Sequence, residues 1–122
     1  MELIEEQLTE KIIGACFDVA NELGAGFLES VYQKALQIAL GHQNMNVKVQ
    51  SPLKVLFRGQ IVGDFYADMI VEDSVIIELK VAKSLSPEHE AQLINYLKAT
   101  KMRVGLLVNF GKPKLEWKRY VN

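Results

Sequence analysis

The chain has very little cysteine, and Cys16 is its one cysteine residue. An internal disulfide and a zinc site built from several cysteines are therefore both excluded. The sequence also lacks a long apolar run, and no stretch approaches the roughly 20 residues that a helix needs to cross a bilayer. Residues 1–6 are acidic, which is typical of neither a signal peptide nor a transit peptide. Together these features favour a cytoplasmic protein without a membrane segment.

Linkers, internal repeats and low-complexity segments are also missing from the sequence. The 122 residues include 49% apolar and 24% charged side chains, which is an ordinary composition for a globular domain. A chain of this length can bury one substantial core. We therefore expect a single domain over residues 1–122.

The formal net charge of −1 hides an uneven distribution of charge. Residues 1–30 hold seven acidic side chains and one basic one, whereas residues 98–122 hold seven basic side chains and one acidic one. A basic C-terminal part would suit a phosphate backbone. The alternative is that the two ends neutralise each other or face solvent, since nucleic-acid-binding domains are more often basic overall. Both interpretations stay open at this point.

Apolar periodicity divides the chain into helices and strands. In chain order the sequence predicts helices at 3–23 and 28–40, strands at 47–57, 61–71 and 75–81, a helix at 87–100, and strands at 103–109 and 115–121. The order α-α-β-β-β-α-β-β predicts an α/β (α+β) fold in which a mixed central sheet is flanked by helices. The apolar strand 103–109 suits a central position, and the more polar strand 115–121 suits an edge.

Several residues mark where these elements begin and end. Glycine tolerates the geometry of a helix C-terminus, so Gly24-Ala25-Gly26 should end the first helix. For the same reason Gly41, together with residues 44–46, should end the second helix. Ser51-Pro52 should interrupt the first strand. Ser86 is a good N-cap and Pro87 a good first residue for the third helix.

Two carboxylates and a lysine stand inside strands that are otherwise apolar, namely Asp68, Glu78 and Lys80. Charged side chains are rare in buried strands unless they are paired, bound to a metal or used in chemistry. Because side chains alternate along a strand, Glu78 and Lys80 share a face. A three-residue loop at residues 72–74 would place Asp68 directly opposite Glu78. A two-residue loop would instead place the two carboxylates on opposite faces of the sheet.

Two carboxylates at such a short distance repel each other unless a cation lies between them. Together with a backbone carbonyl they form an oxygen site that suits Mg²⁺ or Mn²⁺. Lys80 would then orient or deprotonate a water molecule, or stabilise the pentacovalent phosphate of phosphodiester hydrolysis. On spacing alone, a simple salt bridge between Lys80 and one of the carboxylates is the competing interpretation.

Other polar residues have both a functional and a structural interpretation. Gln92 and Tyr96 lie one turn apart on the third helix, where they would either lean over the strand pair or face solvent. His89 would be a ligand or base, although a lone histidine is more often a surface residue. Glu29 begins the second helix, where a carboxylate is favourable for electrostatic reasons alone. Tyr32, one turn later, fits simple packing.

The run from Gly26 to Tyr32 has the pattern G-x-x-E-x-x-Y, which resembles the signature of the GxxExxY protein family. The resemblance continues through Ala67-Asp68, Ile77-Glu78-Leu79-Lys80, and residues 87–100 and 104–111, and so covers nearly the whole chain. That family is similar to a compact branch of the PD-(D/E)XK nuclease superfamily. The resemblance implies a restriction-endonuclease-like αβββαβ core with an extra N-terminal helix and a divalent-metal site.

The resemblance also implies roles for particular side chains. Ala67 stands where the first motif of that superfamily has proline, which is the loosest position of the motif. The residues that match the motifs are Asp68 as the first aspartate, Glu78 and Lys80 as the E-x-K element, the Leu79 carbonyl as a further metal ligand, Glu29 as the acidic residue of the first core helix, and Gln92 and Tyr96 as a Q-x-x-x-Y element.

The function that the resemblance implies is a nuclease that hydrolyses DNA or RNA with Mg²⁺ or Mn²⁺, which Glu29, Asp68 and Glu78 would hold. One alternative is a catalytically silent module on the same scaffold, which would bind nucleic acid or protein. The small size of the chain would suit such a module acting with a partner protein or as a homodimer. A further alternative is a metal-dependent hydrolase of another phosphate ester.

Overall fold

Residues 5–122 are the part of the chain that the structure, a computed structural model, describes. Their helices and strands follow the order predicted from the sequence. They are α1 (Glu6–Leu23), α2 (Glu29–His42), β1 (Val47–Phe57), β2 (Gln60–Val71), β3 (Val75–Lys80), α3 (Pro87–Thr100), β4 (Val104–Asn109) and β5 (Glu116–Val121). The predicted first residues of the N-terminal helix, 3 and 4, lie outside the described residues.

Two of the predicted boundaries are wrong. Gly41 does not end α2, which continues to His42. A helical glycine costs only about 1 kcal/mol relative to alanine, and the buried Leu40 beside it holds this last turn against the core. Pro52 does not interrupt β1, which runs through it to Phe57. The proline is tolerated because β1 is an edge strand, where one N–H group is not needed for pairing.

The strands form one mixed sheet in the order β1-β2-β3-β4-β5. Strands β1, β2 and β3 are successive antiparallel neighbours, whereas β3 and β4 are parallel and are joined by the crossover helix α3. Strand β5 returns antiparallel to β4 at the second edge. All residues of β4 are buried, which confirms the central position predicted for this apolar strand.

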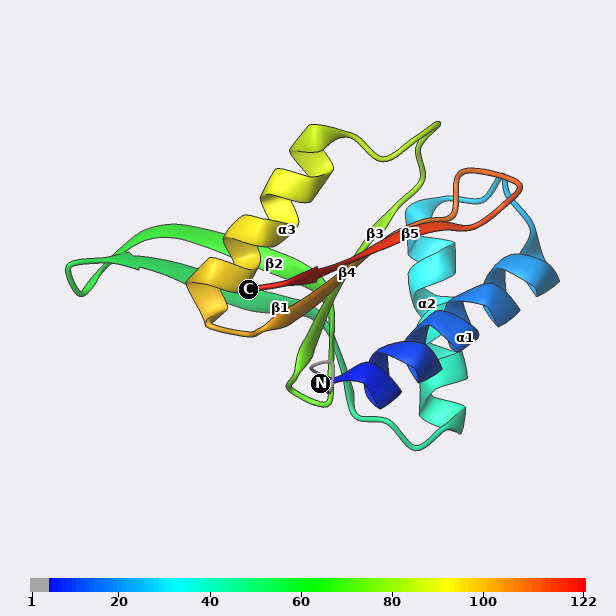
Figure 1. The fold of residues 1–122 in the computed structure, drawn as a ribbon, viewed down its shortest axis with the longest axis horizontal. Coiled ribbons are helices and arrows are strands. Elements are labelled where there is room, and N and C mark those ends of the chain that lie inside the picture. Colours follow the sequence, from blue (N-terminus) through cyan, green and yellow to red (C-terminus); the bar gives the residue numbers. More distant parts are fainter. Residues whose placement is uncertain (1–4) are drawn as a thin grey trace.

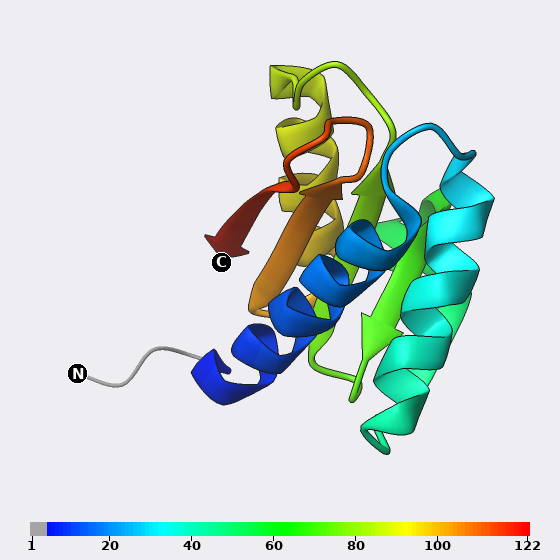
Figure 2. The same ribbon diagram turned by 90° about the vertical axis from the view of Figure 1, so that its right-hand side faces the viewer.

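Helices cover both faces of the sheet (Figures 1 and 2). Helices α1 and α2 pack on one face, where Ile77 and Leu79 of β3 join their core. Helix α3 packs on the other face, where Ile76 meets Leu93. Glu78 follows the alternation of Ile76 and therefore lies on the α3 side. Within residues 5–122 no helix is both long and apolar enough to cross a bilayer.

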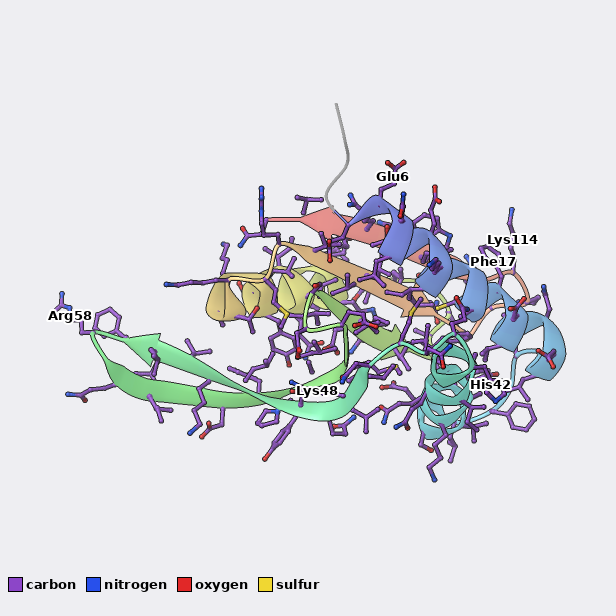
Figure 3. The ribbon with its side chains drawn as sticks, turned by 90° about the horizontal axis from the view of Figure 1, so that it is seen from below. Glu6, Phe17, His42, Lys48, Arg58 and Lys114 are labelled. Carbon is purple, nitrogen blue, oxygen red and sulfur yellow. The ribbon has the colours of Figure 1, made fainter. Side chains whose placement is uncertain are left out.

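The hairpin formed by β1 and β2 extends well beyond the helices, with Arg58 at its tip (Figures 1 and 3). Arg58 and Gly59 have positive φ angles of 50° and 80°, which is the geometry of a tight hairpin turn. The register shifts between Val55 and Leu56, and a bulge of this kind adds twist to a strand pair. The distal hairpin is thereby left with exposed apolar side chains.

Candidate active site

The loop between β2 and β3 has the length that brings Asp68 and Glu78 together. It consists of residues 72–74, and the N–H of Ser74 donates to the Val71 carbonyl at 3.0 Å. Pairing starts at Val71 with Val75 and continues to Met69 with Ile77. The next residues in this register are Asp68 and Glu78, so of the two loop lengths considered from the sequence the structure has the three-residue one, which a shared site requires.

At Asp68 and Glu78, hydrogen bonds from main-chain N–H groups to carboxylate side chains replace the main-chain pairing between β2 and β3. The last main-chain pair is Met69 with Ile77. Beyond it, the N–H of Asp68 donates to Glu78 Oε1 at 3.2 Å, and the N–H of Leu79 donates to Asp68 Oδ2 at 2.8 Å. Each carboxylate thus accepts a hydrogen bond from the opposite strand. The crossed bonds hold the two acids side by side where the strands part.

The environment of Glu78 disfavours its charged form. The residue is only 3% exposed, and burial is the main reason why its pKa is raised to about 8. The neighbouring Asp68 carboxylate raises this pKa further, and the positive charge of Lys80 offsets only part of the effect. The protonated form of Glu78 is therefore favoured when no cation is bound beside it.

Lys80 is linked to helix α3 through a chain of hydrogen bonds. Its Nζ donates to Gln92 Oε1 at 3.1 Å, and Gln92 Nε2 donates to the Tyr96 hydroxyl at 3.1 Å. Burial raises the pKa of Tyr96, and the Glu78 carboxylate adds to this effect. The Tyr96 ring also packs against Phe65 of β2, with 5.6 Å between ring centroids. Gln92 and Tyr96 thus face the strand pair.

Glu29 lies at the edge of this cluster, at the first position of α2. Partial burial raises the pKa of its carboxyl, Asp68 raises it further, and Lys80 lowers it. Glu29 is therefore within electrostatic reach of both groups. Even so, no three acidic, histidine or cysteine side chains within residues 5–122 are grouped so as to hold a metal. The close pair is Asp68 and Glu78, and Glu29 stands outside it.

Two glutamines beside the site were not predicted from the sequence. Gln50 lies opposite Asp68 in the β1–β2 register and has a left-handed φ of 47°. Its Nε2 donates to Gln33 Oε1 at 3.0 Å and lies 3.5 Å from Asp68 Oδ1. The only signal in the sequence is that Gln33 follows Glu29 by one helical turn. Glutamine at such a position is ordinary on any helix surface.

Tyr32 and His89 have structural roles. The buried Tyr32 stacks on Phe110 with ring centroids 4.7 Å apart. Its hydroxyl donates to the Gly24 carbonyl at 2.6 Å and accepts from the Phe27 N–H at 3.2 Å, which fixes the loop before Glu29. His89 belongs to a capping box, in which its Nδ1 accepts from the N–H of Ser86 at 3.1 Å.

The donor atoms at the site fit a hard divalent cation. Asp68 and Glu78 provide carboxylate oxygens, which the crossed hydrogen bonds hold side by side. Mg²⁺ and Mn²⁺ prefer oxygen ligands, and Mg²⁺ commonly uses one or two carboxylates and keeps several waters. A buried carboxyl with a raised pKa beside a second, partly buried carboxyl is also a place where a positive charge would be stabilising.

Comparison with known proteins agrees with this geometry. The chain is similar to the crystal structure of SSO0001, with a TM-score of 0.59 and 20% sequence identity over 97% of this chain and 60% of that one. It thus spans about 60% of the length of that protein. No similar sequence is found among curated proteins. A family model of the PD-(D/E)XK nuclease superfamily matches residues 6–120. With its mixed sheet between two helical layers, the chain belongs to the PD-(D/E)XK nuclease superfamily and has a restriction-endonuclease-like fold.

Proposed function

We propose that the protein is a divalent-metal-dependent nuclease that hydrolyses phosphodiester bonds of DNA or RNA. The observation that carries this proposal is the crossed pair of Asp68 and Glu78, with Lys80 on the same face of β3 as Glu78. A structural salt bridge would explain Lys80 with one acid. It would not explain a second buried acid whose pKa is raised to about 8.

In this proposal Asp68, Glu78 and the Leu79 carbonyl hold Mg²⁺ or Mn²⁺, and Glu29 adds negative charge at the edge of the site. When bound, such an ion polarises a phosphoryl oxygen and stabilises the charge that develops on it. The carboxylates bind the ion only when ionised, so the ion competes with the proton on Glu78.

In this proposal Lys80 orients the attacking water or stabilises the charged phosphate. Gln92 accepts from Lys80 through its oxygen and donates to Tyr96 through its nitrogen, so both ends of the amide are used and its orientation is fixed. A fixed donor aimed at the reacting phosphate lowers the barrier more than a mobile one. Gln92 and Tyr96 are therefore positioning residues for Lys80.

The assignment to the GxxExxY branch is part of the same proposal. Gly26 has a φ of 117°, which favours glycine, and Tyr32 closes the same loop with two hydrogen bonds. This loop leads directly into Glu29 at the start of α2. The glycine and the tyrosine of the signature thus support the position of its glutamate.

A nuclease assay tests the proposal. Labelled single-stranded DNA, duplex DNA and RNA would be incubated with the protein and Mn²⁺ or Mg²⁺, and with EDTA as the metal-free control. We expect metal-dependent cleavage of at least one substrate and its loss in Lys80→Ala. The matched control is Lys54→Ala, which removes an exposed lysine from the hairpin. Cleavage that survives in Lys80→Ala, or no cleavage of any substrate, contradicts the proposal.

A non-catalytic module that binds nucleic acid or protein is the second candidate. It is favoured by the finding that residues 5–122 contain no group of three side chains arranged to hold a metal. Calorimetric titration separates the two candidates. Binding of Mn²⁺ that is lost in Glu78→Gln supports the nuclease, whereas no binding at millimolar Mg²⁺ or Mn²⁺ supports the module.

A further inference from the structure

A hollow of about 630 Å³ lies between the β1–β2 hairpin and helix α3. We call it the hairpin groove. Its volume falls within the range of pockets that hold ligands. The groove is lined by Val55 and Leu56 of β1, Phe65 of β2, Asn95, Lys98 and Ala99 of α3, and Lys101 after it.

The groove combines an apolar floor with positive charge. Leu56 is 62% exposed and Phe65 is 43% exposed, which is unusual for large apolar side chains on two neighbouring strands. Lys98 and Lys101 are exposed on the α3 side, and none of the acidic side chains in residues 5–122 lines the groove. In a chain with a net charge of −1, this is a local concentration of positive charge.

The groove is continuous with the candidate active site. Phe65, which lines the groove, packs against Tyr96 of the site. On α3, Asn95 and Ala99 lie within one turn of Tyr96. On β2, Ile61 lies seven positions from Asp68 and pairs with Leu56 at the far end of the groove. This is about 23 Å of strand.

We propose that the hairpin groove binds an unpaired segment of nucleic acid next to the scissile phosphate. Bases would pack against Leu56 and Phe65, and phosphates would meet Lys98 and Lys101. Exposed apolar side chains select unpaired bases, since the faces of bases in a duplex are already stacked. The distance from Asp68 to the far end of the groove corresponds to about seven stacked nucleotides at 3.4 Å each, or fewer in an extended strand. The identity of the ligand rests on the proposed nuclease function.

A second copy of this chain is the other occupant that an apolar hairpin would suit. Symmetric pairing through the groove would bring Lys98 and Lys101 of both copies into one interface, because a twofold interface uses the same patch twice. Like charges at such an interface are unfavourable. The charge of the groove therefore favours a polyanion over self-association.

The test is a binding measurement in EDTA, in which no cleavage occurs. Fluorescence anisotropy would follow a labelled 12-nucleotide DNA strand of mixed sequence, the RNA of the same sequence, and the DNA duplex. Leu56→Glu and Lys98→Glu change the groove. Their matched controls are Val62→Glu and Lys54→Glu, which lie on the same hairpin and do not line the groove. Circular dichroism and light scattering would record fold and mass.

We expect the single strand to bind at least tenfold more tightly than the duplex. Leu56→Glu should weaken binding at least tenfold and Lys98→Glu about fivefold, with both controls within twofold of the unchanged protein. Lys98→Glu should also make binding less dependent on salt, by about 0.7 in the log–log slope for one lost phosphate contact.

Several results would overturn the groove as a binding site. One is that the unchanged protein does not bind the single strand, or binds the duplex equally tightly. Another is that the groove variants and the control variants lose the same amount of affinity. A third is that the unchanged protein is a dimer, that Leu56→Glu makes it a monomer, and that its affinity for the single strand stays the same. If binding depends on the groove but the protein never cleaves nucleic acid, only the nuclease proposal is contradicted. If Leu56→Glu and Lys98→Glu leave cleavage unaffected, only the role of the groove as a binding site is contradicted.

Discussion

The main-chain N–H of Asp68 donates to Glu78 Oε1 at 3.2 Å, one residue beyond the last main-chain pair of β2 and β3. Two carboxyl groups are thereby held together, and they repel each other as Glu78 ionises near pH 8. Asp68→Asn should relieve that repulsion, because an amide oxygen can still accept from the Leu79 N–H. We expect Asp68→Asn to unfold at equal or higher urea concentration than the unchanged protein at pH 8 in EDTA, and to lose Mn²⁺ binding.

Asp68→Ala is the contrasting variant. It leaves the Leu79 N–H without its acceptor, which costs about 1–3 kcal/mol for a buried donor. Urea denaturation of the two variants side by side separates charge from hydrogen bonding. Lower stability of Asp68→Asn than of the unchanged protein would show that the carboxylate charge itself is stabilising, and equal stability of the two variants would contradict the role of the hydrogen bond.

The raised pKa of Glu78 predicts how stability depends on pH. The folded protein keeps this proton up to about pH 8, whereas the unfolded chain releases it near the ordinary value of 4.5. Between those values the folded state binds more protons, so the free energy of unfolding falls as pH rises. The contribution is complete below about pH 4.5 and is lost as pH rises through 8, a change on the order of a few kcal/mol. Urea denaturation in EDTA at pH 5, 6.5 and 8 measures it.

Two controls accompany the pH series. Glu78→Gln should remove most of the slope, and the small remainder comes from Glu29, whose pKa is raised for similar reasons. Saturating Mn²⁺ should restore stability at pH 8, because a ligand that binds only the folded state stabilises it. A stability curve that is flat from pH 5 to 8 without metal would contradict the prediction.

Much of the fold and the central pair of the site follow from the sequence, because both depend on short-range rules. Alternation along β2 and β3, together with the length of the loop between them, is sufficient to place Asp68 opposite Glu78. Ser86 and Pro87 mark the start of α3 correctly. Each of these features depends on residues close together in the chain, so the local pattern determines it.

Features that depend on distant residues were not predicted. Gln50 lies near Asp68 only because Gln50 has a left-handed φ angle and β1 pairs with β2. The two residues are 18 positions apart in the chain. The basic side chains of the C-terminal part also differ in their surroundings, which composition cannot show. Lys118 pairs with Glu90 at 2.6 Å, whereas Lys98 lines the hairpin groove. Charge counts describe segments, but side-chain partners depend on how the segments pack.

The hydroxyl of Tyr32 should contribute measurable stability. It donates to the Gly24 carbonyl and accepts from the Phe27 N–H, while the ring stacks on Phe110. Tyr32→Phe keeps the ring and removes both hydrogen bonds, so we expect a loss of about 1–2 kcal/mol in urea denaturation. Tyr66→Phe, at a side chain that is 60% exposed, should change stability by less than about 0.5 kcal/mol. Equal stability of the two variants would contradict a role for the Tyr32 hydroxyl.

The segments that follow β3 and β4 are in close contact beside the site. The N–H of Phe110 donates to the Lys80 carbonyl at 2.9 Å. The buried Asn109 side chain accepts from the N–H groups of Ala82 and Gly111 at 3.0 and 2.9 Å. A Cβ on Gly111 would overlap the main-chain nitrogen and oxygen of Ala82. Glycine at this position thus allows the backbone that carries Lys80 to keep its path.

Gly111→Ala should therefore be strongly destabilising, since neither backbone segment can move without breaking the bonds to Asn109. We expect a loss of about 3 kcal/mol in urea denaturation, at the upper end of the cost of overpacking. Gly41→Ala is the matched control, because a Cβ there meets nothing within 4 Å and the residue lies in α2. It should raise stability by about 0.5–1 kcal/mol through helix propensity. If both variants unfold at the same urea concentration, the contact between Gly111 and Ala82 does not constrain the backbone beside Lys80.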